Sequence, residues 1–97
     1  LATSTVRERA TGYLKAHHID RYFDELVFGD TVAHGKPAPD IYLKACEMLD
    51  VRPEEAIAVE DSINGIVSAG IEPNDTTKQY AKKVYEFGRI DRLKELI

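Results

Sequence analysis

The stretch AIAVEDSINGIVSAG, residues 56–70, carries the pattern that decides the fold class. Residues 56–59 form a short, continuous apolar run, which is typical of a parallel strand buried on both faces. Two acids and a serine follow at once, and residues 63–69 then have the spacing of a helix closed by Gly70. This order of apolar strand, polar turn and helix predicts an α/β domain with a mostly parallel sheet.

The residues before this stretch supply a loop and another helix. HGKPAPD, residues 34–40, has the composition of a loop, and Pro39 suits the first helical turn, where its missing N–H is harmless. We expect the helix to run to Leu49. Pro53 and the two acids after it then mark a turn that leads into the predicted strand at residues 56–59.

The first residues of the chain predict a strand, a turn and a helix. Leu1 and Ala2 read as the end of a strand, residues 3–5 as a polar turn, and residues 5–8 as a capping box that opens a helix. Apolar or aromatic side chains then recur at helical spacing on one side: Val6, Ala10, Tyr13, Leu14 and His17.

A second strand is expected shortly after this helix. Tyr22 and Phe23 predict a short helical turn packed on the core, and residues 26–28 predict a brief strand that ends at Gly29. Near the end of the chain, residues 81–85 suit either an edge strand or a helical turn. Leu93 and the apolar residues after it suggest a C-terminal helix.

The composition narrows the class of protein. The 97 residues are 43% hydrophobic and 31% charged, which indicates one ordinary globular domain at most. A net charge of −4 without a basic cluster argues against a nucleic-acid partner. No apolar run approaches the roughly 18–20 residues of a membrane span. Cys46 is the single cysteine; we expect it in the core, and the lack of a disulfide fits the cytoplasm.

Three polar groups follow strand ends or precede helices: residues 3–5, Lys36, and the pair Glu60 and Asp61. Ligands of open parallel sheets bind beyond the carboxyl ends of the strands, so these groups are expected to converge. Hydroxyls and free helix N–H groups suit phosphate oxygens, a lysine neutralises charge, and paired carboxylates suit Mg²⁺. Together they favour phosphoryl transfer, although each alone could be a helix cap or a solvated side chain.

With these motifs, the chain resembles the haloacid dehalogenase superfamily, in particular its β-phosphoglucomutase-like phosphatases and phosphomutases. The resemblance rests on GKPAPD at residues 35–40, AVEDS at residues 58–62 with Gly65, and LATST at residues 1–5. It implies a three-layer α/β/α Rossmann-like core. The implied substrate is a small phosphorylated metabolite, such as a sugar phosphate.

The resemblance also implies the roles of individual residues. Thr3 would bind the transferring phosphoryl group, with Ser4 and Thr5 in the same turn as substrate-binding residues. Lys36 would balance charge on the nucleophile and the phosphate. The remaining two assigned residues, Glu60 and Asp61, would hold Mg²⁺.

The sequence departs from the family pattern in three places. It contains no Asp-x-Asp triplet, the motif that supplies the family's aspartyl nucleophile and its general acid/base, and the helical cap is also absent. After Gly70 a turn-like stretch stands where the family has another strand. Residues 1–97 are therefore interpreted as a partial core domain, explained either by a segment missing after Gly70 or by a truncated chain.

These departures leave alternative functions open. The preferred one is a Mg²⁺-dependent phosphatase or phosphomutase whose nucleophile lies outside residues 1–97. A second is a non-catalytic phosphate- or metal-binding fragment, favoured by the absent nucleophile. A third is a phospho-acceptor signalling domain, which the Lys-Pro-x-Pro-Asp context of residues 36–40 fits poorly.

Overall fold

The computed structural model describes residues 1–70. The sequence predictions for the strand or turn at 81–85, for the C-terminal helix and for the turn after Gly70 lie outside this part. Along the described residues, the elements are β1 (Ala2–Thr3), α1 (Arg7–Ala16), the 3₁₀ turn η1 (Asp20–Tyr22), β2 (Val27–Phe28), η2 (Gly29–Thr31), α2 (Asp40–Leu49), η3 (Pro53–Glu55) and α3 (Ile63–Ser68).

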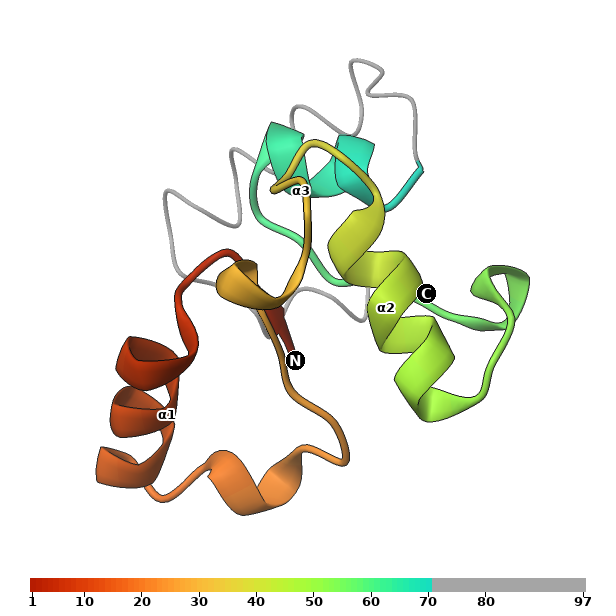
Figure 1. The fold of residues 1–97 in the computed structure, drawn as a ribbon. Coiled ribbons are helices and arrows are strands. Elements are labelled where there is room, and N and C mark those ends of the chain that lie inside the picture. The colour runs from red at the N-terminus through yellow and green to blue at the C-terminus, as the bar shows by residue number, and fades with distance from the viewer. Residues whose placement is uncertain (71–97) are drawn as a thin grey trace.

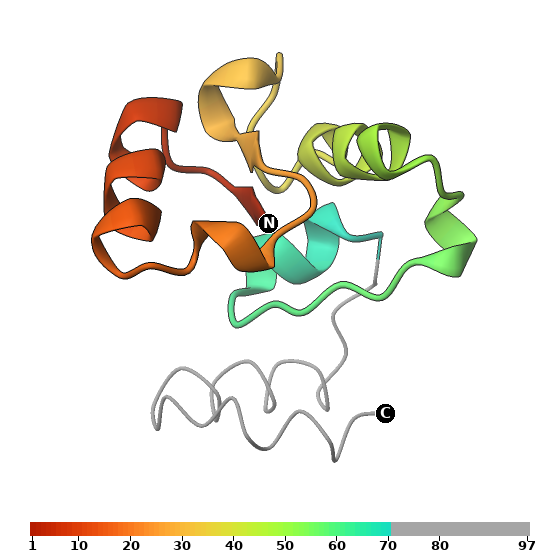
Figure 2. The ribbon, with the colours of Figure 1, turned by 90° about the horizontal axis from the view of Figure 1, so that it is seen from below.

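The two strands form a parallel pair. Ala2 lies opposite Val27 and Thr3 opposite Phe28, with α1 and η1 in the connection between the strands. Helices α1 and α2 lie to either side of this pair in both ribbon views (Figures 1 and 2). The fold is thus α/β with a parallel sheet, as the sequence predicts, and β1 lies one residue later than expected.

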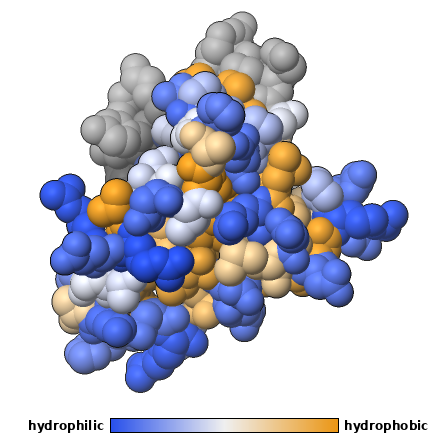
Figure 3. All heavy atoms as spheres, in the orientation of Figure 1, coloured by the Kyte–Doolittle hydropathy of each residue, from blue (hydrophilic) through white to orange (hydrophobic). Residues whose placement is uncertain are grey.

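The core is built around the strand pair and the start of α2. Among residues 1–70, the buried apolar side chains are Ala10, Leu14, Val27, Phe28, Ile41 and Ile66. Figure 3 shows apolar side chains on one face of the molecule, interspersed with charged and polar ones. Cys46, expected in the core, is only half-buried.

The start of α1 differs from the predicted capping box. Val6 occupies the N-cap position and supplies no side-chain cap. The backbone N–H of Arg7 instead donates to Asp30 Oδ1 at 3.0 Å, from the turn after β2. The hydroxyl of Thr5 is not needed as a cap, because a carboxylate brought by the tertiary fold satisfies a free N–H of the first turn.

Fewer side chains of the N-terminal third are buried than the sequence pattern predicts. Ala10 and Leu14 are buried on α1, whereas Val6 is 50% and Tyr13 62% exposed. Tyr22 ends a short 3₁₀ turn as expected, but it is 69% exposed. Within residues 1–70, the sheet beneath this region has two short strands, so only one narrow side of α1 has apolar surface to pack against.

Helices α2 and α3 agree with the sequence patterns. Pro39 stands at the N-cap of α2 rather than inside its first turn, and α2 ends at Leu49 as expected. Ser62 caps α3 by accepting a hydrogen bond from the N–H of Gly65 at 3.0 Å. Gly70 follows with φ of +82°, the left-handed conformation that favours glycine after a helix. No helix within residues 1–70 has the length and apolarity that a membrane crossing requires.

The predicted buried strand at residues 56–59 is not formed. These residues have no regular secondary structure, and Ile57 is 78% and Val59 56% exposed. A strand exists only through hydrogen bonds to a neighbouring strand, and the sheet of the described residues contains β1 and β2 alone. The apolar pattern correctly marks a segment suited to a strand, but it cannot supply the partner.

Candidate active site

Lys36 joins two segments that are far apart in the sequence. Its ammonium forms an ion pair and hydrogen bond with Glu60 Oε1, and it also donates to the carbonyl oxygen of Ala2 at 3.5 Å. Both charged side chains are largely buried, with 13% of Lys36 and 10% of Glu60 exposed. The structure therefore brings the lysine loop, β1 and the first acid of the Glu-Asp pair to one place.

Tyr42, in the first turn of α2, completes this cluster. Its hydroxyl donates to Glu60 Oε1, the same oxygen that pairs with Lys36. The Lys36 ammonium lies 5.0 Å from the centroid of its ring, which is within cation–π range. Burial raises the pKa of Tyr42 well above its ordinary value of 10.0, and the hydrogen bond and negative charge of Glu60 raise it further. The phenol therefore remains a proton donor.

Sequence reasoning missed Tyr42, because its position on α2 reads as one more aromatic core residue. The available signal was its hydroxyl. A phenol that is partly buried at a helix start usually finds a polar partner, and the neighbouring loop contains the one charged residue singled out there.

The turn after β1 is held by its own backbone and by Gly29. Thr3 Oγ1 accepts a hydrogen bond from the N–H of Thr5 at 3.2 Å, and the N–H of Gly29 donates to the carbonyl oxygen of Thr5 at 3.1 Å. A Cβ at Gly29 would lie only 2.1 Å from the carbonyl oxygen of Ser4, so glycine is required for this close approach. Within residues 1–70, hydrogen bonds do not join the side chains of residues 3–5 to Lys36 or Glu60.

Asp61 differs from Glu60 in its exposure to solvent. It is exposed at the surface, whereas the neighbouring Glu60 is largely buried against Lys36. Adjacent carboxylates are of the chemical type that Mg²⁺ prefers. In the part of the chain from Leu1 to Gly70, however, groups of three or more His, Cys, Asp or Glu side chains that could hold a metal ion do not occur. These two acids can supply part of a coordination shell, and other ligands would have to complete it.

Helix α3 limits the space available to the Glu60 carboxylate. A Cβ added at Gly65 would lie 1.9 Å from Glu60 Oε2 and 2.0 Å from its Cδ, so the carboxylate occupies the space that any side chain at Gly65 would need. Ser68, which is 1% exposed, donates from its hydroxyl to the carbonyl oxygen of Ala38 at 2.6 Å. This bond ties α3 to the loop that carries Lys36.

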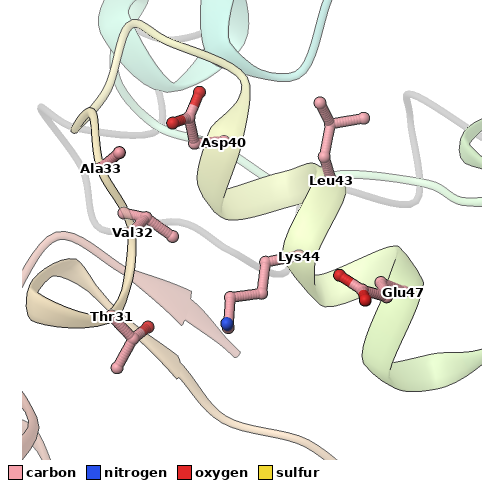
Figure 4. A pocket seen from close by; sticks show the side chains of 7 residues that line it. All are labelled: Thr31, Val32, Ala33, Asp40, Leu43, Lys44 and Glu47. Carbon is pink, nitrogen blue, oxygen red and sulfur yellow. The ribbon is translucent and has the colours of Figure 1, made fainter.

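The surface also has a shallow pocket away from this cluster. Its volume is about 330 Å³, and it lies between residues 31–33 and one side of α2 (Figure 4). The lining residues are Thr31, Val32, Ala33, Asp40, Leu43, Lys44 and Glu47. None of the residues predicted from the sequence to bind substrate or metal lines this pocket.

Comparison with known proteins identifies the family of this arrangement. The profile of the hydrolase family described as haloacid dehalogenase-like hydrolase matches residues 1–71, which is most of the chain. The chain belongs to the haloacid dehalogenase-like hydrolase family. The sequence resemblance to this superfamily is thereby confirmed.

Individual relatives of this haloacid dehalogenase-like chain are also similar in sequence. It is 48% identical over 75 residues to a phosphorylated carbohydrates phosphatase of Thermotoga maritima, an alignment that covers 74% of this chain and 35% of the relative. It is 39% identical over 67 residues to the pyrophosphatase PpaX of Bacillus mycoides, covering 69% and 31%. The chain thus spans about a third of the length of these curated relatives.

A solved structure agrees with the fold. A crystal structure of a protein assigned as a β-phosphoglucomutase from Thermotoga maritima superposes with a TM-score of 0.72 at 40% sequence identity. The superposition covers 84% of this chain and 43% of the other. The similarity confirms an α/β fold like that of the β-phosphoglucomutase branch of the family.

Proposed function

We propose that these residues form part of the active site of a Mg²⁺-dependent phosphatase or phosphomutase that acts on a small sugar phosphate or a related phosphomonoester. The observation that carries this proposal is the largely buried Lys36–Glu60 pair beside β1. Relatives named for phosphorylated carbohydrates and for β-phosphoglucomutase support the choice of substrate class.

In this proposal, Lys36 supplies a positive charge to the transferring phosphoryl group. A compact ammonium in a site that excludes most water stabilises developing negative charge much more strongly than it would in bulk solvent. Its bonds to Glu60 and to the Ala2 carbonyl oxygen already hold it in one place, so little reorientation is needed when substrate binds.

Thr3 is proposed to bind phosphoryl oxygens from the turn after β1. Thr3 is the next residue in the chain after Ala2, whose carbonyl oxygen contacts Lys36. Ser4 and Thr5 would add donors from the same turn, which Gly29 holds in a fixed conformation. This arrangement provides neutral hydrogen-bond donors beside a cation, which suits a phosphate dianion.

Glu60 and Asp61 are proposed as protein ligands of Mg²⁺. When bound, the ion would neutralise charge on the phosphoryl oxygens, in addition to the charge supplied by Lys36. Mg²⁺ typically takes one or two carboxylates together with waters and substrate phosphate, so two adjacent acids fit it by type.

The aspartyl nucleophile is proposed to come from a segment outside residues 1–97, on a strand that pairs with the sheet of this chain. Two features support this. Within residues 1–70, β1 pairs with β2 on one edge only, and residues 56–59 form an exposed apolar segment without a strand partner. A parallel strand added between β1 and residues 56–59 would pair with the backbone of both segments. Such a strand would end beside Lys36 and Glu60.

The experiment measures orthophosphate release from a panel of sugar phosphates by the protein that carries these residues. We expect turnover with Mg²⁺ that is lost with a chelator, and a decrease of about 10²–10³-fold in kcat for Lys36→Ala. The matched control is Lys15→Ala, an exposed lysine at the end of α1, which should leave kcat unchanged.

Two outcomes would contradict the proposal. Undiminished kcat in Lys36→Ala would remove the role of the lysine. Absence of turnover on every sugar phosphate, together with retained Mg²⁺ binding, would favour the non-catalytic binding fragment. Transfer of the phosphoryl group to a second hydroxyl of the sugar, rather than its release, would identify a phosphomutase.

A further inference from the structure

Tyr42 contacts both charged groups of the candidate site and has no role in the proposal above. Its hydroxyl donates to Glu60 Oε1, and its ring faces the Lys36 ammonium at 5.0 Å from the centroid. It comes from the first turn of α2, six residues after Lys36, and is half-buried. Tyr42 thus contacts Glu60 through its hydroxyl and Lys36 through the face of its ring.

Lysine and glutamate need such support because they are long. Fixing either side chain in one rotamer costs more conformational entropy than fixing a short side chain does. The bond to the Ala2 carbonyl oxygen helps to hold Lys36, whereas Glu60 accepts its side-chain hydrogen bonds from Lys36 and Tyr42. Tyr42 has only two side-chain torsions and is anchored on a helix that packs on both strands. Tyr42 can therefore restrict the side-chain conformations of both Lys36 and Glu60.

Glu60 is also bounded by α3. Its carboxylate lies directly over Gly65 of α3, where even a methyl group would come within 2.0 Å of the carboxylate carbon. The phenol of α2 and the bare backbone of α3 thus limit the Glu60 side chain from two elements. Ser68 holds α3 to the Lys36 loop through its bond to the Ala38 carbonyl oxygen.

We infer that Tyr42 is a positioning residue, whose hydroxyl orients Glu60 for metal binding and whose ring holds the Lys36 ammonium beside β1. This inference rests on the proposed function. A purely structural alternative exists, in which the Tyr42 hydrogen bond only stabilises the packing of α2 on its neighbours. The two differ in what a conservative change does to a folded protein.

The first test uses Mg²⁺ alone, without substrate. The dissociation constant of Mg²⁺ is measured by titration calorimetry for the wild type, Tyr42→Phe and the control Tyr13→Phe, whose side chain is exposed on α1. Groups that orient a metal ligand typically change affinity by 10–100-fold when removed, so we expect about a tenfold weaker affinity in Tyr42→Phe. Tyr13→Phe should match the wild type.

The second readout separates positioning from substrate binding. In Tyr42→Phe we expect kcat to fall with KM within twofold of the wild type, since the change acts through the orientation of charged groups rather than on the substrate. A folded Tyr42→Phe protein with both the Mg²⁺ dissociation constant and kcat within twofold of the wild type would overturn the inference and leave Tyr42 with a packing role.

A third measurement distinguishes failure of this inference from failure of the proposed function. The ¹³Cζ resonance of Tyr42 is compared at one pH in the metal-free wild type and in Glu60→Gln. The contact predicts a shift for Tyr42 and none for Tyr13, and an unmoved Tyr42 resonance overturns the inference even if Tyr42→Phe fails to fold. Unchanged Mg²⁺ affinity in Glu60→Gln would instead contradict the metal role of Glu60.

Discussion

The position of the Glu60 carboxylate decides whether Gly65→Ala raises or lowers the free energy of unfolding. Gly65 is inside α3, where replacing glycine by alanine normally stabilises a helix by about 0.5–1 kcal/mol. Here the added methyl carbon would lie 1.9 Å from Glu60 Oε2, 2.0 Å from its Cδ and 2.5 Å from Oε1. Since the obstacle is the end of a flexible side chain, the carboxylate would swing away rather than the backbone move.

The cost is then the interactions that Glu60 gives up. It accepts hydrogen bonds from Lys36 and Tyr42, and a hydrogen bond to a charged group contributes about 1.5–3 kcal/mol. If one of the two is lost and the helix gains about 1 kcal/mol from alanine, the net change is a loss of roughly 0.5–2 kcal/mol in the free energy of unfolding.

The assay is urea unfolding followed by circular dichroism. Gly12→Ala is the matched control, because Gly12 lies inside α1 and a Cβ there would meet nothing within 4 Å. It should stabilise the protein by about 0.5–1 kcal/mol. In a Glu60→Ala background, Gly65→Ala should likewise become stabilising, since the obstructing carboxylate is gone.

Two results would contradict this expectation. One is a Gly65→Ala protein that is stabilised as much as Gly12→Ala. The other is a loss of stability that persists unchanged in the Glu60→Ala background. Either would show that the Glu60 side chain does not occupy the space over Gly65.

Three other residues, Gly29, Ser68 and Tyr42, give predictions for stability. Gly29→Ala should destabilise the protein by about 3 kcal/mol in urea unfolding, because its Cβ would lie 2.1 Å from the carbonyl oxygen of Ser4, and an unchanged midpoint would contradict this. Ser68→Ala should cost about 1–2 kcal/mol in the same assay, since the carbonyl oxygen of Ala38 loses its donor. The pKa of Tyr42 is raised in the folded protein, so its contribution to stability is complete below pH 10 and is lost as the pH rises above that value. The free energy of unfolding should therefore decline more steeply above pH 10 in the wild type than in Tyr42→Phe, and equal slopes would argue against the contact.

Local sequence signals were sufficient for much of the fold. Pro39 and Gly70 mark helix boundaries through their own backbone preferences, and β2 follows from residues 26–28 with a glycine after them. The meeting of Lys36 with Glu60 was also expected and is observed, although residues 56–59 before Glu60 do not form the strand on which that expectation rested.

Features that depend on distant residues were not predictable in this way. Thr5 does not cap the helix as expected; a free N–H of the first turn, that of Arg7, is satisfied by Asp30, a carboxylate that only the folded chain brings near. Residues 56–59 have the apolar pattern of a strand, but strand formation requires a neighbour. The link from Tyr42 to Glu60 spans eighteen positions and depends on how α2 packs, which spacing alone does not give.

Whether this cluster is a phosphoryl-transfer site can be decided by a crystal structure of the protein that carries these residues, grown with Mg²⁺ and tungstate, whose anomalous scattering locates a phosphate-like anion. We expect the anion at the end of β1, with Lys36 Nζ about 2.7–2.9 Å from one of its oxygens. We also expect Glu60 and Asp61 among the ligands of the metal. An anion bound elsewhere, with Lys36 still paired only with Glu60, would contradict the assignment of this cluster as a phosphoryl-transfer site.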